Sequence, residues 1–247
     1  MCMITYIPIN ESNFMLTHSR DESILRPIAT PPIKREINGV RHMYPVDPQG
    51  KGTWIGMSEK GNVAALFNGG TKKHSHEPPY KHSRGLIIPE YFKHQSFNDF
   101  QQNFDSEGLE PFTLLVIEKG HIYEMRKDPD KLDVREIDPL KPQLFMSANL
   151  YPRSTEHDRR LELLNIYYDK GFVSQKEILN YHDVNRFEIT SKNKKYDTGS
   201  HILKTVSTTS ITKTPSSIGI DYLDKVNDIK ITNKLPVSKE QNQEVLQ

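Results

Sequence analysis

The chain has 247 residues, with 33 lysines and arginines against 32 aspartates and glutamates. This balance excludes the strongly basic surface with which nucleic-acid-binding proteins neutralise phosphates. A chain of this length can bury a full core, and its single cysteine cannot form an internal disulfide, so nothing in the composition asks for an oxidising compartment.

The sequence shows neither a membrane-spanning segment nor a signal peptide. No apolar run approaches the roughly 20 residues of a membrane-spanning helix. The first residues lack the basic segment and small-residue cleavage site of a signal peptide. We therefore expect a cytoplasmic protein without a membrane span or nucleic-acid partner, and its oligomeric state stays open.

The first half of the chain reads mainly as strands. Residues 2–9 and 13–21 are short β-rich runs that predict an antiparallel hairpin beginning at Cys2. Residues 26–36 contain three prolines and no periodicity, so we expect a loop there. A second hairpin is predicted over 53–70, with Gly61 and Asn62 at its turn and a polar loop after it.

The rest of the chain alternates helices with strands. Apolar spacing predicts helices over 83–94 and 96–106, the second capped by Ser96, and others over 154–171 and 174–183. Ser154 or Thr155 is expected to cap the third helix, which Gly171 ends. Further strands are predicted in a hairpin over 112–126, a strand over 142–151 and a hairpin over 200–225, where the hydroxyl-rich residues 205–214 are expected to form a solvated face.

This order of elements predicts an α+β fold. Two stacked antiparallel sheets with helices outside would satisfy it, and so would a single sheet with helices. No repeat or change in composition divides the chain. We expect one domain over residues 1–225 and a loosely held polar tail over 226–247.

The position of the only cysteine suggests chemistry. Cys2 follows the initiator Met1, which is normally removed when the next residue is small. Removal would leave a free α-amine beside the thiol, and an α-amine with a pKa near ~8 can accept the thiol proton. Nucleophile and base would then belong to one residue. The alternative is a buried, inert cysteine in an apolar strand.

Several motifs together resemble a known family. The stretch "THSRDESILRP" places an Arg-Asp-Glu cluster after the second strand. With "MCMITY", "GTWIGMSEKGNVAALFN" and "SRGLIIPEYF", it resembles the NRDE family, also called the transport and Golgi organisation 2 family, over residues 1 to about 225. Ser19 stands where that family has Asn. Since strand side chains alternate, Ser19 should face away from Arg20, which indicates a packing difference rather than a lost catalytic group.

The resemblance carries expectations about fold and activity. The family is similar to N-terminal nucleophile hydrolases, whose fold is a four-layer αββα sandwich of two stacked antiparallel sheets. The cysteine members of that group include bile salt hydrolases and penicillin V acylases. The implied activity is hydrolysis or acyl transfer on a non-peptide amide or thioester through a Cys2 acyl-enzyme, without a cofactor. The alternative is a non-catalytic protein that binds or carries haem or a lipid such as acyl-CoA.

The resemblance also implies roles for individual residues. Arg20 would favour the Cys2 thiolate by its charge, and Asp21 would hydrogen-bond the Cys2 amine. Asn149 matches an asparagine that completes the oxyanion hole, with Ser147 near it. From the residues alone, Asn68 before two glycines is a second candidate oxyanion donor. The structural alternatives are an Arg20 salt bridge to Glu22 or Asp21, ordinary turns at Asp21 and Asn68, and a helix N-cap or turn at Asn149.

For the remaining candidate site residues we expect roles in stabilising the structure rather than in binding or catalysis. Trp54 is expected to be a core residue rather than a substrate platform, and Glu22 and Arg26 are expected to hold a loop behind the site. His74, His76 and His82 could bind a metal or haem iron. Their spacing fits no closed zinc pattern, so we expect a solvated loop and no metal.

Overall fold

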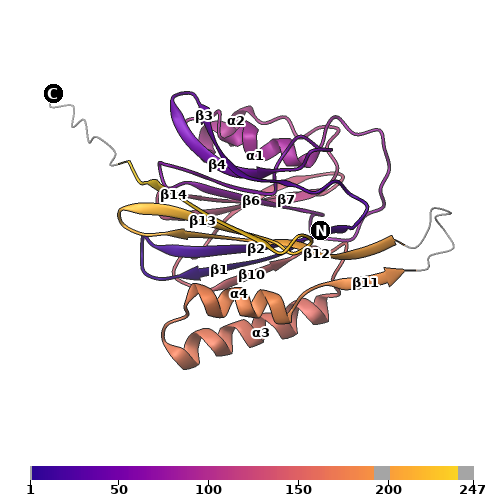
Figure 1. Ribbon diagram of the computed structural model, residues 1–247. Helices are drawn as coiled ribbons and strands as arrows, with labels where there is room; N and C mark the ends of the chain where they lie inside the picture. The colour runs from indigo at the N-terminus through magenta and orange to yellow at the C-terminus, as the bar shows by residue number, and fades with distance from the viewer. Residues whose placement is uncertain (1, 192–200, 239–247) are drawn as a thin grey trace, which may run out of the picture.

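In the computed structural model, which describes residues 2–191 and 201–238, the strands form two antiparallel sheets of seven strands each (Figure 1). Sheet 1 contains, in spatial order, β10 (Gln143–Met146), β1 (Cys2–Pro8), β2 (Phe14–Ser23), β12 (His201–Lys213), β13 (Ser217–Asp224) and β14 (Ile229–Pro236), and β11 (Glu188–Ser191) pairs with β12 beside this path. Sheet 2 contains β3 (Thr30–Ile37), β4 (Val40–Val46), β5 (Ile55–Ser58), β6 (Val63–Asn68), β7 (Phe112–Glu118), β8 (His121–Lys127) and β9 (Leu132–Ile137).

Helices cover the outer face of each sheet. A 3-10 turn, η1 (Arg84–Leu86), leads into α1 (Ile87–Tyr91), which is followed by α2 (Phe97–Asn103), and these pack on sheet 2. The helices α3 (Arg153–Lys170) and α4 (Gln175–Val184) pack on sheet 1. Figure 1 shows the two helix pairs on opposite sides of the stacked sheets. The predicted four-layer αββα sandwich is therefore confirmed, and the single-sheet alternative is wrong.

The alternation of apolar side chains along β1 explains why two sheets are needed. Cys2, Ile4 and Tyr6 belong to the core between the sheets, whereas Met3 and Ile7 belong to the core beneath α3 and α4. A strand with apolar side chains on both faces needs other elements packed against both faces to keep those side chains out of water. Sheet 2 covers one face of β1 and the helices cover the other.

The four predicted hairpins are all present. They are β1–β2, β5–β6, β7–β8 and β12–β13, each paired antiparallel. Gly61 and Gly120 have positive φ in the second and third turns, a conformation that glycine adopts without strain. Ser96 accepts a hydrogen bond from the Asp99 backbone amide at 3.1 Å and caps α2, as predicted.

The loop predicted over 26–36 is wrong in its second half. Residues Thr30–Ile37 form β3, which pairs only with β4 at the edge of sheet 2. Pro31 and Pro32 lie at a register shift in this pairing, where a missing backbone donor does not interrupt the ladder. The strands β4 and β9 were also not predicted.

Two features of the helices differ from expectation. The first predicted helix, over 83–94, is limited to η1 and the short α1. Helix α3 has Pro152 at its N-cap without a side-chain cap, so Ser154 and Thr155 lie inside its first turn. Its end at Gly171, with φ 64°, is as predicted.

The solvated face predicted over 205–214 is wrong. Thr205, Ser207, Thr208, Thr209 and Ser210 are all buried. Strand β12 lies between β2 and β13, with sheet 2 on one side and helices on the other, so both of its faces are covered. Ser210 Oγ lies 2.9 Å from Thr17 Oγ1, whereas the buried hydroxyls of Thr208 and Thr209 have no hydrogen-bond partner among the described residues.

The predicted loose tail is wrong for residues 229–236, which form β14 against β13. Residues 239–247 lie outside the described residues, as does Met1. No helix in the described part of the chain combines the length and apolar composition needed to cross a membrane.

The backbones around Gly52 and Gly85 approach each other closely. The Thr53 backbone amide donates to the Gly85 carbonyl at 2.9 Å. A Cβ on Gly52 would lie 2.2 Å from the Gly85 carbonyl carbon, far inside van der Waals contact. The contact between the segments "GTW" and "SRG" therefore requires glycine at position 52, whereas a Cβ on Gly85 would lie 3.2 Å from its nearest atoms, a smaller conflict.

We expect Gly52→Ala to lower the free energy of unfolding by at least about 2 kcal/mol, because backbone atoms would have to move apart. Urea denaturation measures this. Gly219→Ala is the control, since its nearest atom would be 3.6 Å away, an ordinary contact. Equal stability of the two variants would contradict the close approach.

Candidate functional site

Cys2 lies at the start of β1, directly opposite Arg20 of β2. Its side chain points into the space between the sheets and is only 3% exposed. It lines a cleft of about 120 Å³. The other lining residues come from both sheets and from the loops between them: Arg20, Glu22, Arg26, Asp47, Gly52, Thr53, Trp54, Leu66, Asn68, Ser83, Arg84 and Gly85.

The charge of Arg20 is held by a carboxylate that the sequence analysis did not single out. Arg20 Nη2 donates to Asp47 Oδ2 at 2.8 Å, and Arg26 Nε donates to the same oxygen at 2.7 Å. Glu22 Oε2 lies 3.7 Å from Arg20. Arg20 therefore does form a salt bridge, which was the structural alternative to a role in the site. Its main partner is Asp47 rather than Glu22 or Asp21.

The Trp54 ring packs in the core between the sheets, as predicted, and also lines the cleft. The Arg20 guanidinium lies over this ring, 4.5 Å from its centroid, in a cation–π contact. The ring and Asp47 together hold Arg20 beside Cys2.

The electrostatics around Cys2 disfavour the thiolate. Burial raises the pKa of the Cys2 thiol, and the Asp21 carboxylate raises it further. The charged N-terminal amine of the chain, the Asp21 backbone amide and the Arg20 guanidinium lower the pKa but do not outweigh burial. Since Arg20 is neutralised by Asp47, the buried thiol needs a base to become a nucleophile at neutral pH.

Asp21 lies on the opposite face of β2 from Arg20. Its Oδ2 accepts a hydrogen bond from the Tyr151 hydroxyl, and its Oδ1 accepts one from Thr205 Oγ1, both at 2.7 Å. Burial raises the pKa of this carboxyl, although both hydrogen bonds lower it. Asp21 is thus held rigidly beside the start of β1, and its contact with the Cys2 amine stays a prediction.

Ser19 faces α4, as its alternation with Arg20 predicts. Its Oγ lies 2.8 Å from His182 Nδ1, and Thr5 Oγ1 lies 2.9 Å from His182 Nε2. Burial lowers the pKa of His182 to about 3, so this ring is neutral. Ser19 thus belongs to a buried contact between sheet 1 and a helix.

Asn68 ends β6 and lines the cleft together with Cys2. Ser147 connects the two residues, since its backbone amide donates to the Cys2 carbonyl at 3.1 Å and its Oγ donates to the Asn68 carbonyl at 2.6 Å. This bridge fixes the end of β6 in sheet 2 against the start of β1 in sheet 1. Asn68 therefore lines the cleft from a backbone that is fixed relative to Cys2.

Asn149 does not line this cleft. Its Oδ1 accepts from the His74 backbone amide at 3.1 Å, and its Nδ2 lies 3.5 Å from His74 Nε2. In the structure Asn149 thus holds the loop after β6. Its part in an oxyanion hole stays a prediction.

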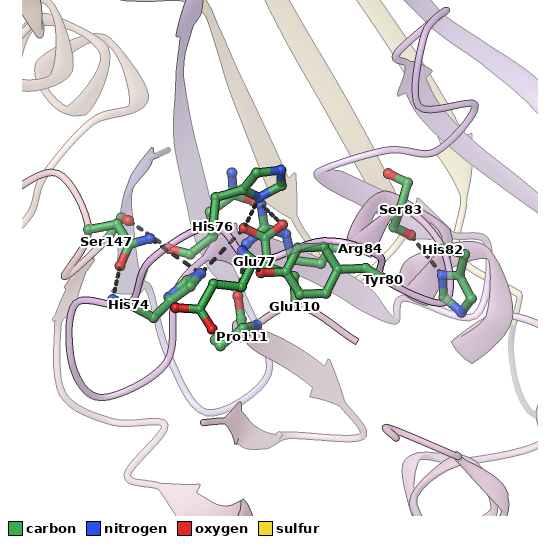
Figure 2. A network of polar contacts seen from close by, with 12 residues as sticks. His74, His76, Glu77, Tyr80, His82, Ser83, Arg84, Glu110, Pro111 and Ser147 are labelled. Carbon is green, nitrogen blue, oxygen red and sulfur yellow. Dashed lines mark hydrogen bonds and ion pairs between the residues drawn. The ribbon is translucent and has the colours of Figure 1, made fainter. Parts of the chain in front are cut away.

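The solvated loop expected around the histidines is wrong for His74, whose side chain is 8% exposed. Figure 2 shows the network that holds it: His74 Nε2 and His76 Nδ1 lie 3.3 and 3.1 Å from Glu110 Oε1. Glu110 Oε2 pairs with Arg84 at 2.8 Å. The network joins the loop to a cleft-lining arginine. Among the described residues, no group of three or more His, Cys, Asp or Glu side chains has an arrangement that could hold a metal ion.

The sequence of this chain matches one protein family over nearly its whole length. A profile described as transport and Golgi organisation 2 matches residues 1–237. The chain belongs to the transport and Golgi organisation 2 family. No curated protein matches at a significant level.

Several solved structures have a fold similar to that of this family member. A cysteine-to-alanine mutant of a conjugated bile acid hydrolase from Clostridium perfringens is similar, with a TM-score of 0.55, 11% identity, and coverage of 95% of this chain and 96% of that chain. An arginine-to-leucine variant of the same hydrolase gives a TM-score of 0.54 at 11% identity, covering 98% and 100%. An N-acylethanolamine-hydrolyzing acid amidase orthologue from Caenorhabditis elegans gives 0.48 at 11%, covering 85% and 92%. The two bile acid hydrolase structures show that this family member has the N-terminal nucleophile hydrolase fold.

Some site residues of this family member were not found by sequence reasoning. Asp47 was missed, although the turn "VDPQG" is typical of an aspartate that accepts from the backbone, as it does from Gln49 and Gly50. Arg84 was seen only as part of a motif. Neither residue's approach to Cys2 follows from sequence spacing, since each arrives on a different loop.

We expect Asp47→Asn to lower the free energy of unfolding by about 3 kcal/mol at pH 7, because two partly buried guanidinium groups lose their anion. Burial favours the neutral acid, but the Gly50 amide, Arg20 and Arg26 outweigh it and lower the pKa of Asp47. The stability that the wild type gains is therefore full above the ordinary pKa of 3.8 and is lost as the pH falls below it.

Urea denaturation between pH 2 and pH 7 measures both effects, and the variant should show a smaller loss of stability in acid. Asp105→Asn is the control, because Asp105 pairs with Lys81 at the exposed surface. A variant as stable as the wild type at pH 7 would contradict the structural role of Asp47.

Proposed function

We propose that this chain is an N-terminal cysteine hydrolase or acyltransferase, acting on a non-peptide amide or thioester through an acyl-enzyme on Cys2. The observation that carries the proposal is the meeting of Cys2, Arg20 and Asn68 in one cleft between the sheets. The fold supports it, because a conjugated bile acid hydrolase has the same fold. A shared fold does not establish a shared reaction, so the site carries the argument.

The mechanism begins with removal of Met1, which exposes the Cys2 α-amine. This amine is the base that the raised pKa of the thiol calls for. It accepts the thiol proton, and the thiolate attacks the substrate carbonyl carbon to form a carbon–sulfur bond. Asp21, held by Tyr151 and Thr205, orients the resulting ammonium group.

The negative charge that develops on the carbonyl oxygen needs hydrogen-bond donors. We assign this part to the Asn68 side chain, because Asn68 lines the cleft with Cys2 and its backbone carbonyl is held by Ser147. When the intermediate collapses, the bond to the leaving nitrogen or sulfur breaks and the ammonium returns its proton to that atom. Water, or an acceptor amine, then attacks the acyl-enzyme and regenerates the thiol.

We expect Cys2→Ala to remove all turnover while keeping the fold, because the change deletes one sulfur atom from a strand that is otherwise intact. Turnover is measured on a panel of acyl p-nitroanilides and N-acetylcysteamine thioesters, and the fold by circular dichroism. Intact mass shows whether Met1 is removed, and a thiol-directed acylating probe should label the wild type once. Since Cys2 is the only cysteine, this label is unambiguous.

Retained turnover in Cys2→Ala would contradict the proposal. A retained Met1 would remove the proposed base from the mechanism. Saturable binding of haem or acyl-CoA without any turnover would favour the non-catalytic carrier instead.

We expect Asn68→Ala to lower kcat about 10²–10³-fold with little change in KM, because its amide acts on charge that is present only in the transition state. Steady-state kinetics on the best substrate of the panel measure this. Asn165→Ala, at an exposed position of α3, is the control. An unchanged kcat in Asn68→Ala would show that the oxyanion donor lies elsewhere.

A further inference from the structure

A second, smaller pocket lies beside the Cys2 cleft. It has a volume of about 30 Å³ and shares two lining residues with the cleft, Arg20 and Arg26. These two arginines therefore form the boundary between the two spaces. The aliphatic part of each arginine side chain is apolar and can border a hydrocarbon group while the guanidinium stays paired with Asp47.

Half of the residues that line this second pocket are apolar: Ile24, Pro27, Ile28, Ala29, Val206 and Val226. The rest are Tyr222 and the polar residues Arg20, Ser23, Arg26, Ser207 and Asp224. The Asp224 carboxylate already accepts hydrogen bonds from the backbone amides of Val226 and Asn227. Val206 lies at a register shift in β12, next to the residue that pairs with Arg20. A bulge of this kind redirects a side chain, and here the redirected residue lines the pocket.

Apolar side chains continue from this pocket onto the surface. Ile24 is 42% exposed, Ile28 51% and Val226 46%, and all three line the pocket. The first two lie in the connection from β2 to β3, and Val226 lies in the turn from β13 to β14. Exposed apolar groups that gather at one place usually mark a binding surface, and this one adjoins the candidate active site.

The cleft is lined by more charged side chains than the pocket. Glu22, Asp47 and Arg84 line it together with the two arginines that it shares with the pocket. A hydrocarbon chain placed there would separate charged groups from water without replacing their contacts, which is costly. A polar group suits the cleft, and an alkyl group suits the pocket.

We propose that the pocket and its exposed apolar rim bind the acyl chain of the substrate, while the cleft binds a polar leaving group. This inference rests on the proposed function and names its substrate class, an amide or thioester of an alkyl carboxylic acid. The scissile carbonyl lies at Cys2, the acyl chain passes Arg20 and Arg26 and stays attached to Cys2, and the leaving group departs through the cleft.

The volume of the pocket sets the expected chain-length dependence. A space of about 30 Å³ holds roughly two waters, and so about two methylene groups. Each buried methylene strengthens binding about fourfold. The value of kcat/KM should rise about 15-fold from the acetyl to the butyryl thioester, and less steeply to octanoyl as the chain extends over the rim.

The test measures kcat/KM for acetyl, butyryl, hexanoyl and octanoyl thioesters of N-acetylcysteamine. Ile28→Asn should lower the octanoyl-to-acetyl ratio at least fourfold, because a polar side chain replaces part of the pocket wall. Leu161→Asn is the matched control, since Leu161 is similarly exposed but lies on α3, outside both spaces. A flat chain-length profile, or equal profiles for the two variants, would overturn the inference.

A second readout does not depend on turnover. Methyl, propyl and hexyl methanethiosulfonates each transfer an alkylthio group to the Cys2 thiolate and release methanesulfinate, and the rate is followed by intact mass relative to free cysteine. Rates that rise with chain length, and fall back in Ile28→Asn, support the apolar pocket even if no thioester is turned over, in which case only the proposed function fails. Rates that are independent of chain length, with or without turnover, overturn the pocket.

Discussion

The alternation of side chains along β2 is the constraint on which the rest of the site depends. It sends Arg20 into the space between the sheets and sends Ser19 and Asp21 toward the helices. One strand thus supplies a cation on the face that carries the Cys2 thiol and a carboxylate on the other. A shift of one residue in the β1–β2 register would exchange the two faces. Pairing on both sides of β1, with β2 and with β10, prevents this shift.

The charges near Cys2 are arranged to hold one another rather than to ionise the thiol. Asp47 accepts from two arginines, and the Trp54 ring covers one of them. Burial raises the pKa of the Cys2 thiol, and the lowering by Arg20 does not outweigh it. The same contacts give the cleft a fixed charged wall beside the partly apolar second pocket.

Local sequence patterns were enough to predict much of the fold. The hairpins β1–β2, β5–β6, β7–β8 and β12–β13 follow from apolar runs separated by turn residues, and the end of α3 follows from Gly171. These features depend on residues that are close in the chain. The edge strand β3 was missed because its prolines are tolerated only where no second neighbour needs their amides, and edge position is a property of the whole sheet.

By itself, then, the sequence determined the nucleophile candidate, the family motifs and the strands that carry Cys2, Arg20 and Asp21. It did so because a strand's alternation and a residue's place in the chain are local properties. Only the tertiary structure decided that Asp47 neutralises Arg20, that Ser147 joins Cys2 to Asn68, and that Asn149 holds His74. It also decided that the hydroxyls of β12 are buried and that a partly apolar pocket adjoins the cleft. These contacts join residues from separate sheets and loops, and such distances are set by how the two sheets stack rather than by any spacing in the chain.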